Sequence, residues 1–239
     1  MRVDHPATVG LSPAALGDWL KPRPGDAAVL KLRAELIATT PEAVLARLPA
    51  AEPGVAELAA VLSARDGFLV AGDALAALGR RYAEDLCLLV PDGTQHVLAA
   101  AVLCFPNRWR LADKIGRPLL AVHGPVPDYA ERLSQQVDFF LSRLRPGRCF
   151  VRANWGLVST PALHLPDPVA AVNPLRDEHV YVRREEQSFV KLPASGAVVF
   201  AIRTSVTPWA EVPADDRAAI LAQTQSLSPA WLKYKSIQA

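Results

Sequence analysis

The chain has 239 residues, of which 51% are hydrophobic and 21% are charged, and its formal net charge is +2. This composition is typical of a globular protein with a sizeable core and excludes a disordered chain. Lysine and arginine are scattered along the sequence, so the charge gives no reason to expect a nucleic acid or an anionic membrane as a partner. The longest uninterrupted apolar run, residues 97–105, is far shorter than the roughly 20 residues of a membrane-spanning helix. The N-terminus has no apolar signal core either, so we expect a cytoplasmic protein.

The three cysteines, Cys87, Cys104 and Cys149, each lie in an apolar or alternating stretch. An odd number of cysteines without CxxC spacing argues against a disulfide framework, a zinc knuckle and covalent haem attachment through CxxCH. We therefore expect all three to be small buried hydrophobic residues.

Residues 1–84 are predicted to be helical. Thr40-Pro41-Glu42 places a cap before a proline at the first helical position, and Ser12-Pro13 has the same form. Two stretches rich in alanine and leucine, near 54–64 and 73–83, predict two more helices.

From Asp85 onward the pattern predicts strands. Residues 86–90 and 97–105 flank a turn signal and predict a β-hairpin. The pattern Asp128-x-x-Glu131 is that of a capping box and predicts a helix that ends at Pro146-Gly147. Further along, the sequence predicts strands over 148–158, 179–191 and 196–206, and then a helix near 213–225.

Five strands in mostly antiparallel order, with helices at both ends of the chain, indicate the α+β class. We expect a single domain over residues 1–239. It consists of a helical region at 1–84, a sheet core at 85–210, and a C-terminal helix and tail at 211–239.

Many motifs of catalysis and nucleotide binding are missing from the sequence. It contains no GxGxxG, Walker A, HExxH, GxSxG or CxxC pattern. If redox chemistry occurs, we do not expect NAD(P)H to bind this chain.

Polar residues on the predicted strands are candidates for a site. Alternation places Arg152 and Asn154 on one face of their strand, Arg183 and Glu185 on one face of the next, and Arg203 on the third strand. One interpretation is a solvated sheet face with structural ion pairs. The other is an internal pocket whose charges bind propionate groups or polarise a ligand.

Two histidines lie in constrained apolar surroundings. His123 lies within residues 119–127, and His164 lies in the proline-rich segment 161–166. A histidine in such surroundings is usually a hydrogen-bonded core residue, and the alternative is an axial ligand of haem iron.

Several segments resemble the alpha-subunit family of haem-dependent oxidative N-demethylases, in order from about residue 10 to 237. They include Cys104-Phe105-Pro106-Asn107-Arg108-Trp109, Ile115-Gly116-Arg117-Pro118-Leu119, Val122-His123-Gly124-Pro125, Arg152-Ala153-Asn154-Trp155, Ile202-Arg203-Thr204 and Lys233-Tyr234-Lys235.

This resemblance implies a PAS-like fold, in which an antiparallel sheet and short helices enclose a haem b held by a histidine. It also implies oxidative removal of a methyl group from a small secondary amine of the dimethylamine type, with O₂ as the oxidant. The electrons come from NADPH through FMN and an iron–sulfur cluster on separate partner subunits.

Together with the residue pattern, the resemblance leads to expected roles for particular residues. His123 is the expected iron ligand, and His164 is the alternative. Glu185 and Arg183 are expected to hold the amine and polarise the oxygen. The residues expected to bind the cofactor are His123, Arg152, Asn154, Trp155 and Arg203.

The chain departs from the family at Glu185-Glu186, where a basic residue normally follows the glutamate. We expect residues 183–186, together with Lys191, to form a mixed-charge docking surface for the reductase. Two other functions remain open: a haem-binding PAS-like sensor without catalysis, and a haem-free interaction subunit.

Overall fold

A computed structural model describes residues 10–93 and 95–238, so residues 1–9, the hairpin residue Thr94 and Ala239 lie outside the description. A sheet of seven strands in the order β1-β5-β6-β7-β3-β4-β2 forms the centre of the fold, and every neighbouring pair is antiparallel. The strands are β1 (Ser12–Ala14), β2 (Leu45–Arg47), β3 (Asp85–Asp92), β4 (Gln95–Val102), β5 (Cys149–Val158), β6 (Tyr181–Lys191) and β7 (Val198–Pro208).

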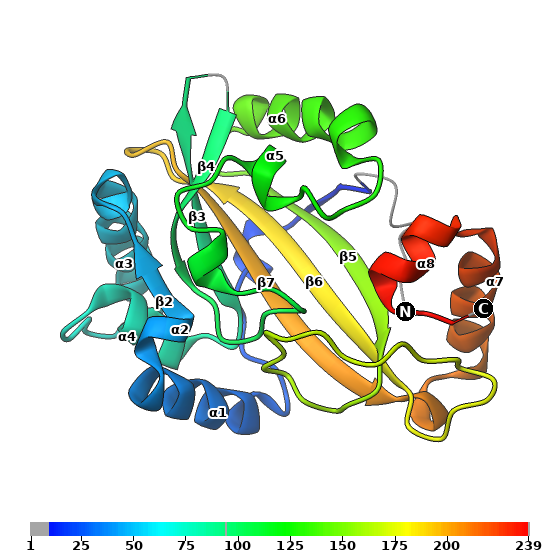
Figure 1. The fold of residues 1–239 in the computed structure, drawn as a ribbon. Coiled ribbons are helices and arrows are strands. Elements are labelled where there is room, and N and C mark those ends of the chain that lie inside the picture. The colour runs from blue at the N-terminus through cyan, green and yellow to red at the C-terminus, as the bar shows by residue number, and fades with distance from the viewer. Residues whose placement is uncertain (1–9, 94, 239) are drawn as a thin grey trace.

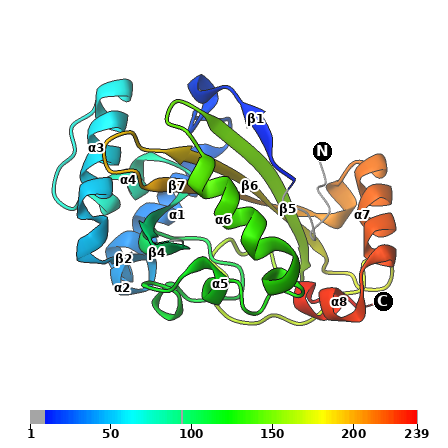
Figure 2. The same ribbon diagram turned by 90° about the horizontal axis from the view of Figure 1, so that it is seen from above.

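Helices cover both faces of the sheet (Figures 1 and 2). In both views α5 and α6 lie over one face, α1 to α4 gather around β2 to β4, and α7 and α8 lie together at the opposite side. The helices are α1 (Asp26–Thr39), α2 (Pro41–Val44), α3 (Glu52–Asp66), α4 (Ala74–Arg81), α5 (Leu119–Val122), α6 (Ser134–Arg143), α7 (Ala214–Ser226) and α8 (Pro229–Lys235).

Strand alternation divides the apolar side chains between two cores. On β3, Leu86 and Leu88 pack with the residues of α1, α3 and α4, whereas Cys87 and Leu89 pack with α5 and α6 on the other face. A third cluster joins the far ends of β5 and β6 to α7. All three cysteines are buried, as expected, and burial raises the pKa of each thiol.

The predicted α+β class is confirmed, as are the hairpin, the three later strands and helices α3, α4 and α7. That the sheet is PAS-like stays a prediction. Within the described residues, no helix is both long enough and apolar enough to cross a membrane.

The prediction that residues 1–84 are helical is wrong at Ser12–Ala14 and Leu45–Arg47, which add two edge strands to the sheet. Ser12-Pro13 opens β1, which pairs only with β5; at an edge, the missing N–H of Pro13 breaks no ladder. Helix α2 does begin at Pro41, but it is only 4 residues long and runs directly into β2. The Thr40 hydroxyl donates back to Leu36 O in α1, so it caps nothing in α2.

The expected capping box at the start of the α6 segment is also not formed. Asp128 has a left-handed backbone (φ 57°) and its side chain accepts no capping hydrogen bond. The segment instead begins with a π-helical turn, Tyr129–Leu133, that leads into α6. Such turns concentrate at functional sites, and this one places Tyr129 beside His123.

A buried ion pair joins the N-terminal helices to the sheet. Arg33 of α1 and Asp85 of β3 are both fully buried, with Nη1 2.5 Å from Oδ1. Arg33 Nε also donates to Gly79 O at 2.8 Å, and the Asp85 carboxylate accepts the N–H groups of Cys104 and Phe105 at 2.7 and 3.0 Å. One pair therefore ties α1, α4, β3 and the end of β4 together.

We predict that Arg33→Met lowers the free energy of unfolding by about 3–5 kcal/mol, because it leaves the Asp85 charge buried without its cation. Chemical denaturation followed by circular dichroism measures this change. The control is Arg47→Met, since Arg47 pairs with Glu52 and Asp73 at the surface, where we expect a loss of about 1 kcal/mol or less. Equal losses in the two variants would contradict the assignment.

Candidate functional site

A cavity of about 480 Å³ lies between the sheet and the segments that cover it on the α5–α6 side. This volume is within the range of roughly 300–1,000 Å³ that is usual for ligand and cofactor sites. The sheet contributes side chains from β3 to β7, the cover contributes residues of α5, α6 and their connection, and α8 closes one end. We refer to it as the central cavity.

Much of the wall of the central cavity is apolar. On the sheet side, Leu89, Leu98, Phe189 and Phe200 line it, and the rings of Phe189 and Phe200 are stacked with centroids 4.8 Å apart. The facing residues on the cover are Leu119, Val122, Leu133, Val137 and Leu141. A wall of this kind suits a large flat apolar ligand.

His123 enters the central cavity at the C-terminal end of α5. Its Nδ1 lies 2.9 Å from Leu119 O, and its ring is stacked on Tyr129 with centroids 4.4 Å apart and planes at 15°. Burial lowers the pKa of His123 to about 4; the hydrogen bond to Leu119 opposes this shift, and the charges of Lys114 and Arg152 add to it. The imidazole is therefore neutral at neutral pH.

This hydrogen bond decides the tautomer of His123. A backbone carbonyl only accepts, so Nδ1 is the nitrogen that bears the proton and Nε2 keeps its lone pair. Among the described residues, none forms a hydrogen bond with Nε2. A neutral imidazole whose other nitrogen donates to a carbonyl is the form in which histidine binds metals.

His164, the alternative ligand, is placed differently. It is half-buried in the loop that follows β5, its Nδ1 is 2.8 Å from Cys104 O, and it does not line the central cavity. Of the two histidines, the structure brings only His123 together with the polar residues of the sheet.

Four polar side chains from β5 and β6 meet in the central cavity: Arg152, Asn154 and Glu185, which are candidates from the strand pattern, and Gln187, which is not among those candidates. Asn154 is directly opposite Glu185 in the register of the two strands. The amides of Asn154 and Gln187 both donate to Glu185 Oε2, each at 3.3 Å. Only 13% of the Glu185 side chain is exposed, so its carboxylate faces the cavity and not bulk solvent.

Arg183 is on the same face of β6 as Glu185 but does not line the central cavity. Its side chain is fully buried, and Nε is 3.5 Å from Glu185 Oε1. Its terminal nitrogens donate to the carbonyls of Phe105, Pro106 and Leu163 at 2.6, 3.2 and 2.9 Å. Arg183 therefore contacts Glu185 and also joins the loops that contain Phe105 and Leu163 to the sheet.

Trp155 and Arg203 are placed on the other face of the sheet. Trp155 packs against the α7 side, where Nε1 donates to Gln223 Oε1 at 2.9 Å. Arg203 forms ion pairs with Asp26 at 2.5 Å and Glu84 at 2.7 Å. The structure does not bring either residue to the central cavity.

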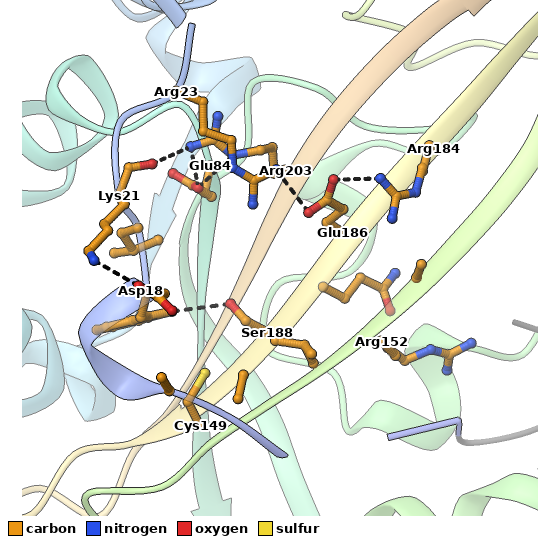
Figure 3. Close-up of a pocket in the computed structure, with 17 residues that line it drawn as sticks. Asp18, Lys21, Arg23, Glu84, Cys149, Arg152, Arg184, Glu186, Ser188 and Arg203 are labelled. Carbon is orange, nitrogen blue, oxygen red and sulfur yellow. Dashed lines mark hydrogen bonds and ion pairs between the residues drawn. The ribbon is translucent and has the colours of Figure 1, made fainter. Parts of the chain in front are cut away.

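Arg203 lines a second, smaller cavity of about 280 Å³, shown in Figure 3. Its charged residues pair with one another: Arg203 with Glu84, Glu186 with Arg23 and Arg184, and Lys21 with Asp18. The Arg152 side chain points away from this network (Figure 3). The pairing accounts for these charges without a ligand.

The expected docking surface at residues 183–186 does not form one continuous strip. Alternation places Arg183 and Glu185 on the side of the central cavity, and Arg184 and Glu186 on the side of the second cavity. β6 is also paired on both sides, with β5 and β7, so these residues belong to the interior of the sheet.

Several residues of the central cavity were not identified from the strand pattern, because they come from loops and from α8. They are Arg108, Lys114, Tyr129, Lys233, Tyr234, Lys235 and Ser236. Arg108 and Ser236 both have left-handed backbones, with φ of 60° and 56°, and Arg108 Nη1 donates to Ser236 Oγ. Most of them fall within the short segments that carry the family resemblance, which is the signal that could have identified them.

The donor set of the central cavity indicates how a metal could be held there. Among the described residues, no group of three or more His, Cys, Asp or Glu side chains is arranged to hold a metal ion. In the described lining of the central cavity His123 is the one histidine, and its Nε2 keeps the lone pair.

Comparison with known proteins places this geometry in a family. No curated protein matches the chain. The model of the family described as haem-dependent oxidative N-demethylase, alpha subunit-like, matches residues 62–239, about three quarters of the sequence, and includes every residue of the central cavity. The chain therefore belongs to the haem-dependent oxidative N-demethylase alpha-subunit-like family.

Proposed function

We propose that this protein binds a haem b in the central cavity and catalyses the oxidative N-demethylation of a small secondary amine of the dimethylamine type. The electrons come from a separate reductase that bears FMN and an iron–sulfur cluster. The observation that supports this best is the combination of a neutral histidine and a shielded carboxylate in one largely apolar cavity.

The residues of the central cavity fit a haem. His123 Nε2 would bind the iron, since Nδ1 is already occupied by Leu119 O. The apolar wall that includes Leu98, Phe189 and Phe200 would contact the porphyrin. Haem b has two propionates, and Arg108, Lys114 and Arg152 supply cations that would pair with them.

The bound haem supplies the oxidative chemistry with O₂ and two electrons. The net reaction also takes up two protons, and it releases formaldehyde, the shorter amine and water. The chain contributes the binding and orientation of the amine, which is a cation in solution at neutral pH. The Glu185 carboxylate attracts this cation, and the amides of Asn154 and Gln187 hold the carboxylate in place.

Arg183 acts through Glu185 in this proposal. Its guanidinium contacts the carboxylate oxygen Oε1 but does not line the cavity, so the part of the carboxylate that faces the cavity is left for the substrate. The apolar wall excludes water, which strengthens the attraction between the carboxylate and the amine.

We predict that His123→Ala abolishes or markedly shifts the Soret band of protein expressed with an adequate supply of haem. The physical reason is that His123 is the nitrogen donor that the structure places in the cavity. His164→Ala is the control, and its spectrum should match that of the wild type. An unchanged spectrum in His123→Ala together with a loss in His164→Ala would reverse the assignment.

We also predict that Glu185→Gln weakens the amine-induced change of the haem spectrum by roughly 10- to 100-fold in apparent Kd, as expected when a hydrogen bond to a charged group loses its charge. Haem content should stay nearly unchanged. The matched control is Glu186→Gln, which removes the same charge one residue away on the other face. If both substitutions leave amine binding as it is in the wild type, Glu185 has no role in recognising the substrate.

A third prediction concerns the source of electrons. The sequence has no glycine-rich nucleotide motif and no CxxC set, so the purified chain should not oxidise NADPH in the presence of amine. Adding a flavin and iron–sulfur reductase should start NADPH consumption and formaldehyde release. Rapid NADPH oxidation by the chain alone would refute the dependence on a partner, and reduction without amine turnover would favour a sensor.

A further inference from the structure

A lysine from the C-terminal helix is buried in the wall of the central cavity. Lys235, the last residue of α8, is only 3% exposed. Its ammonium group donates to the backbone carbonyl of Trp155 and to Asn154 Oδ1 at 3.5 Å, and it lies 4.7 Å from the centre of the Trp155 ring. Lysine is rarely buried because its ammonium group loses hydration, so a lysine held in this way needs a physical explanation.

A chain of hydrogen bonds connects Lys235 to Glu185. Lys235 donates to the Asn154 carbonyl oxygen, and the Asn154 amide nitrogen donates to Glu185 Oε2. An ammonium group can only donate and a carboxylate can only accept, so the two neighbours together determine the orientation of the Asn154 amide. Besides Arg183, whose guanidinium contacts Glu185 directly at 3.5 Å, the ammonium of Lys235 is therefore a second cation that the chain provides to the Glu185 site.

The backbone around Lys235 is held at a sterically costly conformation. Ser236, the next residue, caps α8 in the left-handed region, where residues other than glycine are disfavoured. Its hydroxyl accepts from Arg108, which is itself left-handed. The N–H of Val172 donates to Ser236 O, and the N–H of Gln238 donates to Val172 O. These contacts fix the end of α8 over β5 and direct Lys235 into the cavity.

The charges around Lys235 are opposed. Burial lowers the pKa of Lys235 to about 7; Glu185 on β6 raises it, while Arg108 after β4 and Arg152 on β5 lower it further. Lys233 and Tyr234 of α8 also line the cavity, and Tyr234 interacts electrostatically with Glu185 and Arg108. Near neutral pH the lysine thus exists in both the charged and the neutral form.

We propose that Lys235 competes with the substrate inside the cavity. Its buried ammonium is linked to Glu185 through Asn154 and supplies a positive charge there. A methylated ammonium ion binds beside Glu185 when Lys235 releases its proton. This inference rests on the proposed function, because it takes an ammonium substrate as given. The released proton is one that the oxidation of the amine consumes. Lys235 is accordingly a positioning residue that couples the binding of the substrate cation to the loss of its own proton.

The direction of the pH effect follows from this exchange. Below the pKa of Lys235 the site holds the charge of the lysine in addition to that of Arg183, so a further cation binds weakly. Above this pKa the lysine is neutral, only Arg183 remains, and the cation binds more tightly. For complete exclusion and a pKa of about 7, the apparent Kd should fall about tenfold between pH 6 and pH 8. Binding at pH 7 should release about half a proton per bound cation.

Isothermal titration calorimetry of the haem-loaded protein tests this, with buffers of different ionisation enthalpy to count released protons. The probes are dimethylammonium and tetramethylammonium. Tetramethylammonium has no proton to lose, so any proton released on its binding comes from the protein.

Two substitutions should have opposite effects. Lys235→Met should bind both probes more tightly than the wild type at pH 6, without proton release and without dependence on pH. Lys235→Arg keeps a permanent charge and should bind both weakly at every pH, again without proton release. A general disturbance of folding does not tighten binding in one variant and weaken it in the other. Lys31→Met removes an exposed lysine of α1 that lines neither cavity, and it should keep the pH dependence of the wild type.

The outcomes separate this inference from the proposed function. If the wild type binds the probes with the same Kd at pH 6 and pH 8 and releases no proton, the role of Lys235 is refuted while the amine site stands. If the pH dependence persists in Lys235→Met, another group exchanges the proton and the inference is equally refuted. If no probe binds to any variant at either pH, the cation site does not exist and both proposals fail.

Discussion

The structure depends on the fact that protein lies against both faces of β5, β6 and β7. A side chain on these strands therefore has two possible environments. One is the central cavity; the other is the helical core with the small second cavity, where Arg184 and Glu186 keep 25% and 31% of their side chains exposed. Since successive residues alternate between them, one position along a strand decides whether a charge meets a ligand or an ion-pair partner. Glu185 and Glu186 are adjacent in sequence, and the sheet separates their carboxylates.

A charge that is buried between the sheet and its cover needs a partner of opposite charge. Some of the buried charges have such a partner within the protein. Arg33 with Asp85, and Arg203 with Glu84 and Asp26, are compensated by partners within the protein. The central cavity is not balanced in this way, since its described lining contains five cationic side chains and one carboxylate, Glu185. An excess of cations suits a cofactor with two propionates, and the single carboxylate is left for a small cation. Lys235 is one of these five cations, and hydrogen bonds through Asn154 also link it to the carboxylate of Glu185.

The sequence predicted the fold class, five of the seven strands and the meeting of Arg152, Asn154 and Glu185, because alternation within one strand can be read directly. The register between neighbouring strands could not be predicted from the sequence. Arg203 lies opposite Glu186, and not opposite Glu185, because of the register between β6 and β7, which long-range packing decides. The two edge strands were missed because each has only 3 residues, too few to show a period. Lys235 was read as part of a short tail, since nothing local shows that α8 packs its lysine against β5.

Glu186, where the family resemblance implies a basic residue, has a structural role that is separate from the central cavity. Its carboxylate lies on the face away from the central cavity, where it pairs with Arg184 at 2.6 Å and with Arg23 at 3.0 Å. A basic residue at this position would place a third cation beside Arg23 and Arg184, whereas the acidic residue pairs with both. Arg23 belongs to the segment between β1 and α1, which lies before the region that the family model matches. The carboxylate of Glu186 thus contacts the N-terminal segment of the same chain, on the face of β6 that lies away from the central cavity.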